Sequence, residues 1–347
     1  MTCIHFAKTK HNTEAFDKRS SPWADDNRPS FLTPEAGATP AHRSIPAPSL
    51  LPLIGQTPLL RLTRIADGLP ETVALYVKLE GMNPGGSVKD RAASFIVQDA
   101  LCSGALAPGK TLIDATSGNT GIAYAMLGAA LGFSVKLALA ANASPERLQI
   151  LYAYGAELIL SDPAGGTEGA RQLVQEMVAA TPECYFYADQ YNNPANPQSH
   201  FSTTGPEIWQ QTKGQITHFV AGIGTGGTLV GIGRYLRKVN PAVRLVGVQP
   251  EGPQHGIAGL KHLATSEMPR VFTPELVDTT LVVQTHEAET MARRLARSEG
   301  VFVGISSGAA VVAAIRVARE LRAGTVVALL PDGGYKYTSA AFWQESP

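Results

Sequence analysis

The stretch Asn83–Arg91 reads NPGGSVKDR and places Lys89 between a turn-forming run and the start of a predicted helix. Proline followed by two glycines favours a tight turn. A cation is unfavourable at a helix N-terminus, because the helix dipole is positive there. Burial and this dipole make an ammonium lose its proton more easily, and the free amine is a nucleophile. We therefore interpret Lys89 as a candidate nucleophile, although most lysines at helix starts are solvated surface charges.

Three glycine-bearing turns follow this lysine: TSGNTG at 116–121, GIGTGGT at 222–228 and GISSGA at 304–309. Each is predicted to precede a helix, where free backbone N–H groups can bind an anion. Asn119 adds a side-chain donor to the first turn, and Thr225 and Thr228 add hydroxyls to the second. A lysine that can form an imine, together with several anion-binding turns, is what a protein needs to hold pyridoxal phosphate.

The same turns have other interpretations. Gly222, Gly224 and Gly227 satisfy the dinucleotide pattern GxGxxG, and Glu251 lies roughly where an acid that binds a ribose would be expected. A nucleotide-binding oxidoreductase is therefore an open alternative, although it leaves the other turns unexplained. Taken alone, Ser306 is better interpreted as a helix N-cap.

Composition narrows the class of protein. The chain has 347 residues, 44% hydrophobic and 17% charged, which is typical of a compact globular enzyme. Lys plus Arg and Asp plus Glu are each 29, so no net charge attracts nucleic acid or a membrane surface. The three cysteines lie far apart, and no metal-binding spacing is present. No apolar run is long enough to span a membrane, and no secretory signal is recognisable, so we expect a cytoplasmic protein.

Short apolar strands alternate with helices along the chain, which predicts an α/β fold with mainly parallel twisted sheets flanked by helices. The predicted strands are 74–79, 111–114, 135–139, 157–160, 218–221, 244–248 and 326–330, and the predicted helices are 91–103, 121–131, 145–154, 167–180, 229–239, 286–299 and 309–321. We expect an N-terminal extension at 1–48, a larger domain from 49–81 plus 194–347, and a smaller mobile domain at 82–193.

Together these segments resemble the fold-type II pyridoxal-phosphate enzymes, in particular the cysteine synthase and cystathionine β-synthase family. The resemblance runs from IGQTPL at 54–59 to PDGGYKY at 331–337, and NPGGSVKDR is similar to the lysine motif of the synthases. The stretch 267–278 is more similar to the B-type cysteine synthases than to the A-type. The resemblance implies the tryptophan synthase β-like fold, a cleft that holds the cofactor, and a homodimer.

The resemblance also implies roles for individual residues. Lys89 should carry the cofactor as an imine and move protons, Asn119 should bind its phenolic oxygen, and Ser306 should face its pyridine nitrogen. The phosphate should lie on Gly224, Thr225, Gly226, Gly227 and Thr228, and the substrate carboxylate on Thr116, Ser117, Thr120 and Gln190.

The expected chemistry is β-replacement. A serine at the pyridine nitrogen cannot protonate it as an aspartate would, so the ring is a weaker electron sink and elimination is favoured over transamination. We expect L-cysteine to form from O-acetylserine or O-phosphoserine and a sulfur donor such as sulfide, through an aminoacrylate intermediate. Condensation of serine with a thiol, as in cystathionine β-synthase, and synthesis of another β-substituted alanine stay open, as does a catalytically idle relative.

Two positions depart from the pattern of the family, and the second bears on the substrate. Asp114-Ala115 stands where many relatives have Glu-Pro. Lys261 follows a segment near the substrate mouth in relatives, and a cation there favours a phosphorylated serine over an acetylated one. Lys261 is therefore a candidate substrate-binding residue, and a solvated charge in a loop is the alternative interpretation.

Overall fold

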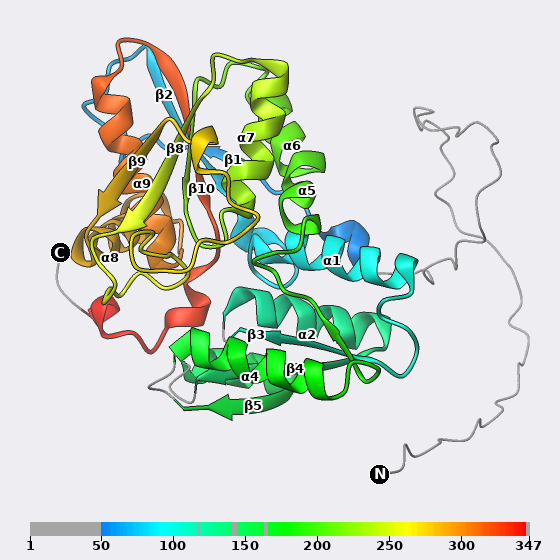
Figure 1. Ribbon diagram of the computed structural model, residues 1–347. Helices are drawn as coiled ribbons and strands as arrows, with labels where there is room; N and C mark the ends of the chain where they lie inside the picture. Colours follow the sequence, from blue (N-terminus) through cyan, green and yellow to red (C-terminus); the bar gives the residue numbers. More distant parts are fainter. Residues whose placement is uncertain (1–49, 117, 141–143, 163–165, 345–347) are drawn as a thin grey trace, which may run out of the picture. The chain divides into compact units, whose positions relative to one another are not determined.

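The computed structural model describes residues 50–344, apart from 117, 141–143 and 163–165. The predicted extension at 1–48 lies outside the described residues, as does Ser117. Two sheets organise the rest, one of six strands and one of four. Figure 1 shows both sheets with helices packed along them.

The six-stranded sheet has the order β1-β2-β10-β7-β8-β9. All neighbouring strands are parallel except β1 and β2, which are antiparallel. Its strands are β1 Leu59–Arg61, β2 Val73–Leu79, β7 His218–Gly222, β8 Arg244–Pro250, β9 Thr279–Val283 and β10 Gly324–Leu330. Strands that are buried on both faces are expected to be continuously apolar, as 326–330 is.

Strand β10 shows how this sheet is covered on both faces. Val326 and Ala328 pack in one hydrophobic cluster and Val327 and Leu329 in another, because successive side chains of a strand point to opposite faces. The first cluster includes α8 Thr285–Arg294 and α9 Ile305–Glu320, and the second includes α7 Gly227–Val239. Helices α5 Ala195–Ser202 and α6 Thr204–Gln211 pack on α7, as seen in Figure 1.

The four-stranded sheet has the order β5-β4-β3-β6 and is parallel throughout. Its strands are β3 Thr111–Ala115, β4 Ser134–Ala140, β5 Glu157–Ser161 and β6 Tyr185–Tyr187. Helices α1 Lys89–Ser103, α2 Asn119–Leu131 and α3 Pro145–Ala153 contribute to one cluster, and α4 Gly166–Ala180 contributes to the other.

Short helical turns connect these elements. The 3-10 turns are η1 Leu51–Leu53, η2 Glu80–Met82, η4 Pro274–Leu276, η6 Gly334–Tyr337 and η7 Ala341–Gln344. The helix predicted over 286–299 is observed as α8 followed by one π-helical turn, η5 Leu295–Glu299.

The predicted α/β class with mainly parallel sheets is confirmed, and so are the seven predicted strands and seven predicted helices, to within a few residues at their ends. Strands β1, β6 and β9 and helices α5 and α6 were not predicted. The division into two domains stays a prediction, because both sheets belong to one compact unit. Among the described residues, no helix is long and apolar enough to cross a membrane, and no group of metal-binding side chains is found.

Candidate active site

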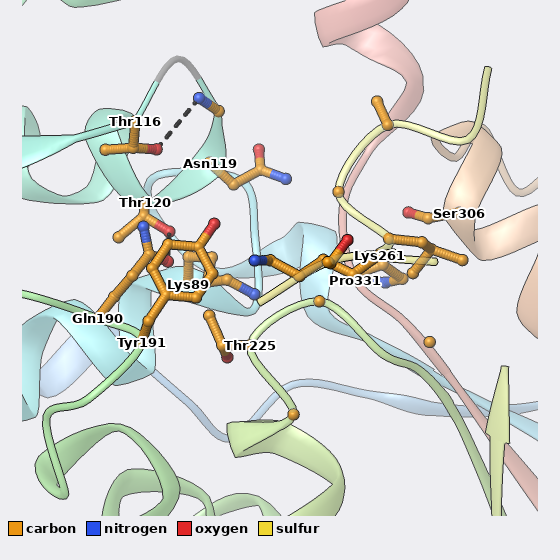
Figure 2. A pocket seen from close by; sticks show the side chains of 18 of the residues that line it. Lys89, Thr116, Asn119, Thr120, Gln190, Tyr191, Thr225, Lys261, Ser306 and Pro331 are labelled. Atoms are coloured by element: carbon orange, nitrogen blue, oxygen red, sulfur yellow. Dashed lines mark hydrogen bonds between the residues drawn. The ribbon is translucent and has the colours of Figure 1, made fainter. Parts of the chain in front are cut away.

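A cavity of about 590 Å³ lies where strands of both sheets end. Residues that follow β3, β7 and β10 line it, so the turns at 116–121 and 222–228 meet at the carboxyl ends of parallel strands. Ligands of open α/β sheets bind at such edges. Figure 2 shows Lys89, Gln190, Thr225 and Lys261 gathered around this space. A volume of this size accommodates a cofactor with a small substrate.

The turn before Lys89 is built as its sequence predicts. The Gly86 N–H donates to the carbonyl of Asn83 at 2.8 Å, and Gly86 has a φ of 77° that favours glycine. The Gly85 N–H donates to the Asp90 carboxylate at 2.6 Å, and a Cβ at Gly85 would lie 2.6 Å from that carboxylate. These contacts fix Lys89 as the first residue of α1, with its side chain lining the cavity.

Lys89 is poised to act as an amine. Its side chain is half-buried, and the described part of the chain offers its Nζ no hydrogen bond or salt bridge. Burial lowers the pKa of the Lys89 ammonium, and the nearby Asp332 carboxylate acts in the opposite direction. Because burial has the larger effect, the Lys89 ammonium loses its proton more readily than an exposed lysine does.

The glycine turn at 222–228 forms a narrow cradle between β7 and α7. A Cβ at Gly224 would lie 2.5 Å from the carbonyl oxygen of Gly259, and Gly226 has a φ of 80°. The Thr225 hydroxyl accepts hydrogen bonds from Asn196 Nδ2 at 3.1 Å and from the Gly227 N–H at 3.2 Å. Gly224, Thr225, Gly226 and Thr228 line the cavity, and Gly227 is buried beside it. A close-packed glycine backbone at a helix N-terminus suits a phosphate.

A second polar group comes from the turn after β3 and from Gln190, which follows β6. Thr116, Asn119, Thr120 and Gln190 all line the cavity. The Thr120 hydroxyl donates to Gln190 Oε1 at 2.7 Å, and both side chains are buried. This contact leaves the Gln190 amide nitrogen to donate to an anion, which fits the predicted binding of a carboxylate.

Ser306 lines the cavity from the first turn of α9 and is 5% exposed. The interpretation of Ser306 as an N-cap is wrong, because Gly304 occupies that position and α9 begins at Ile305. Its hydroxyl is therefore available to a ligand.

Lys261 also lines the cavity, and its role in binding substrate stays a prediction. Its Nζ lies 4.5 Å from the centre of the Tyr191 ring, a cation–π arrangement seen in Figure 2. Burial lowers the pKa of Lys261, and the Arg171 guanidinium lowers it further.

Several lining residues were missed from the sequence. His255, His262 and Tyr191 line the cavity, although none of them stands in a motif that points to a site. His200, which is buried, pairs with the Thr228 hydroxyl at 3.2 Å. The position of His255 and His262 in the loop after β8, at the same sheet edge, is the signal that could have found them.

Asn119 is tied to the C-terminal segment, which sequence reasoning did not predict. Its Nδ2 donates to Asp332 Oδ2 at 2.8 Å, and its Oδ1 accepts from Lys336 Nζ at 2.7 Å. Both partners are buried.

Comparisons with known proteins agree on one family. A family model described as pyridoxal-phosphate dependent enzyme matches residues 50–332. A cysteine synthase of Aquifex aeolicus is 53% identical over 302 residues, which are 86% of this chain and 92% of the relative. Cysteine synthase B of Salmonella typhimurium is 47% identical over 292 residues, covering 84% and 95% of the two chains.

Solved structures give the same result. A cysteine synthase of Entamoeba histolytica has a TM-score of 0.83 at 34% identity, over 90% of this chain and 95% of that one. An O-acetylserine dependent cystathionine β-synthase of Helicobacter pylori has a TM-score of 0.81 at 34% identity, over 86% and 100%.

Glu251, the acid of the dinucleotide alternative, accepts hydrogen bonds from Thr285 instead of lining the cavity.

Proposed function

The chain belongs to the family of pyridoxal-phosphate dependent enzymes, and on that premise we propose that it is a cysteine synthase. It replaces the β-substituent of an O-activated L-serine with a sulfur nucleophile such as sulfide. The observation that carries the proposal is Lys89, whose amine lines a cavity bounded by a glycine cradle and a polar loop.

The cavity fits pyridoxal 5′-phosphate. Gly224 and Gly226 leave no room for a side chain where the backbone would cradle a phosphate, and the N-terminus of α7 faces the same point. The cofactor, when bound, supplies an electron sink that makes the β-substituent easier to release. We assign its phosphate to Gly224, Thr225, Gly226, Gly227 and Thr228.

The protein groups around the cofactor have separate tasks. Lys89 attaches the cofactor covalently and moves protons at the substrate Cα. Asn119 donates to the ring oxygen. Ser306 meets the ring nitrogen with a neutral hydroxyl, which withholds full protonation and so favours β-replacement over transamination. Thr116, Thr120 and Gln190, with Ser117 outside the described residues, bind the substrate carboxylate.

A direct assay tests this function. The purified protein loaded with pyridoxal phosphate should form L-cysteine from O-acetylserine and sulfide, quantified by mass spectrometry. Lys89→Ala should lose nearly all turnover, whereas Lys238→Ala, a change at an exposed lysine of α7, should retain it. The proposal is refuted if the loaded protein forms cysteine neither from O-acetylserine nor from O-phosphoserine.

Lys261 bears on the leaving group. No carboxylate of the described residues forms a salt bridge with its ammonium, which rests on the Tyr191 ring at the cavity wall. A phosphate dianion can pair with this cation, whereas a neutral acetyl ester gains little. One charge-assisted contact contributes about 1.5–3 kcal/mol.

Lys261→Ala should therefore lower kcat/KM for O-phosphoserine roughly ten- to a hundredfold and leave O-acetylserine nearly unchanged. The two donors are compared under the same conditions, with Lys238→Ala as the surface control. Equal small effects on both donors would remove Lys261 from the substrate site and leave O-acetylserine as the donor.

A second candidate function is the condensation of the same activated serine with a larger thiol. The structural similarity to the Helicobacter pylori enzyme favours it. Competition between sulfide and homocysteine in one reaction separates the two, since the products are cysteine and cystathionine.

Further proposals concern the whole protein. We assign it to the cytoplasm, supported by the exposed free thiols of Cys102 and Cys184, which suit a reducing compartment. We also propose a homodimer, and a larger domain at 49–81 plus 194–347 that carries the phosphate cradle beside a smaller one at 82–193.

A further inference from the structure

The Asn119 carboxamide is held between two groups of opposite charge. Lys336 Nζ donates to its Oδ1 at 2.7 Å, and its Nδ2 donates to Asp332 Oδ2 at 2.8 Å. An ammonium can only donate, and an ionised carboxylate can only accept. Only one of the two orientations of the Asn119 amide satisfies both partners. The two charges therefore place Oδ1 toward Lys336 and Nδ2 toward Asp332.

Lys336 is built into this position. Its side chain is 5% exposed, and its Nζ also donates to the carbonyl oxygens of Gly85 at 3.0 Å and Gly86 at 3.2 Å. These carbonyls belong to the turn that precedes Lys89. A single buried ammonium in η6 thus joins the C-terminal segment, the lysine turn and the start of α2.

Asp332 is equally constrained. It is 1% exposed, and its Oδ2 also accepts a hydrogen bond from the Tyr337 hydroxyl at 2.7 Å. Its backbone forms an isolated antiparallel bridge with Ser87, and a Cβ at Gly304 would collide with its carboxylate. The carboxylate therefore cannot move away from Asn119 without disturbing its neighbours.

We propose that Lys336 and Asp332 are positioning residues that orient and polarise Asn119 for an anionic oxygen of the cofactor ring. Asn119 Nδ2 carries two hydrogens, and Asp332 engages one of them, which leaves the other for a ligand in the cavity. A cation on Oδ1 draws electron density out of the amide and strengthens its N–H groups as donors. The inference rests on the proposed role of Asn119 and adds two residues that act through it.

A double-mutant cycle tests this coupling on the loaded protein. The variants are Lys336→Met, Asn119→Ala and their combination, with Lys238→Met as a surface control. The readouts are the absorption spectrum of the bound cofactor and kcat/KM for cysteine formation. Lys336→Met should move absorption from the near-visible band toward the near-ultraviolet, since the ring oxygen loses its strengthened donor, and lower kcat/KM roughly ten- to a hundredfold.

In the Asn119→Ala background, Lys336→Met should change the spectrum little, because the contact through which it acts on the ring oxygen is already removed. It should lower kcat/KM by a smaller factor than in the parent, and the remaining effect reports the loss of its contacts with the Gly85 and Gly86 carbonyls. Lys336→Arg, which keeps the charge, should restore part of the near-visible band. Asp332→Asn should give a similar spectral change, and it keeps the proposal testable if Lys336→Met does not fold.

Equal effects of Lys336→Met in both backgrounds, or an unchanged spectrum in Lys336→Met and Asp332→Asn, would overturn the inference. Such a result in a parent protein that binds the cofactor and forms cysteine leaves the proposed function intact. A parent protein that does neither contradicts the proposed function itself.

Discussion

Asp114 is a buried carboxyl directly before the loop that we assign to the substrate. Its Oδ1 accepts a hydrogen bond from the Ala115 N–H at 2.8 Å, whereas its Oδ2 has no partner with hydrogen-bond geometry among the described residues. The buried Tyr124 hydroxyl and the Asp189 carboxylate lie close enough to influence it. Burial raises the pKa of Asp114 to about 7, and Asp189 adds to that rise.

Asp114→Asn should therefore alter the pH dependence of stability. The unfolded carboxyl releases its proton near 3.8 and the folded one near 7, so the folded parent holds the extra proton in between. The contribution of Asp114 to the parent's free energy of unfolding consequently falls as pH rises through that window, and the asparagine variant lacks this contribution. Urea titrations across the window should show that the free energy of unfolding of the variant rises relative to that of the parent up to about pH 7. A constant difference at every pH would mean that Asp114 ionises normally in the folded protein.

At this scale the sequence predicted side chains that lie in motifs and missed those that act through long-range contacts. Lys89, Asn119 and Ser306 belong to turns whose residue types predict an anion-binding site or a nucleophile. All three line one cavity. Lys336 is 217 residues from Asn119, and nothing in its neighbourhood distinguishes a buried lysine from a surface one. Only the folded chain brings the two together.

At the level of secondary structure, the cradle that we assign to the phosphate is built from a strand, a glycine turn and a helix. The turn between β7 and α7 passes so close to the loop after β8 that Gly224 faces the carbonyl of Gly259. The Gly259 carbonyl is part of the backbone and cannot rotate away as a flexible side chain can. A methyl group added at Gly224 must therefore widen or tilt the cradle.

Gly224→Ala should for this reason weaken retention of pyridoxal phosphate roughly ten- to a hundredfold, since such overpacking costs about 1–3 kcal/mol. Equilibrium binding of the cofactor, followed by fluorescence, provides the measurement. Gly252→Ala is the matched control, because a Cβ there meets no atom within 4 Å. Equal affinities in the two variants would place the phosphate elsewhere.

Four of the five elements that the sequence did not predict have a physical reason. Helices α5 and α6 contain Asn196, Pro197 and Pro206, residues that favour turns, and their stability comes from packing on α7. Strands β1 and β6 span only three residues each, too few to show a periodicity. The helices and strands that were predicted have an apolar pattern that continues over enough residues to show which of their faces are buried.

Across the molecule, a buried cluster of charges joins parts that are distant in sequence. Arg91 of α1 pairs with Glu80 of η2 at 2.7 Å and with Glu207 of α6 at 2.6 Å. Lys78 of β2 pairs with the same Glu207 at 2.7 Å. Arg91 and Glu80 are 1% and 0% exposed, so each depends on the other for compensation of its charge.

Arg91→Met should lower the free energy of unfolding by about 3–5 kcal/mol, because it leaves Glu80 buried without its partner. Glu157→Gln offers a matched control: it breaks the Lys136–Glu157 pair, whose carboxylate is 64% exposed. That change should cost less than about 1 kcal/mol. Urea titrations followed by tryptophan fluorescence compare them, and similar losses in both would show that the buried cluster does not hold these elements together.

The function that we propose requires that one lysine, Lys89, carries the cofactor in the cavity between the two sheets. Borohydride reduction of the loaded protein, followed by proteolysis and mass spectrometry, locates the attachment directly. We expect loss of the near-visible absorption and a cofactor-sized mass increase on the peptide that contains Lys89, with none in Lys89→Ala. Attachment to another lysine, or no attachment in a protein that forms cysteine, would contradict it.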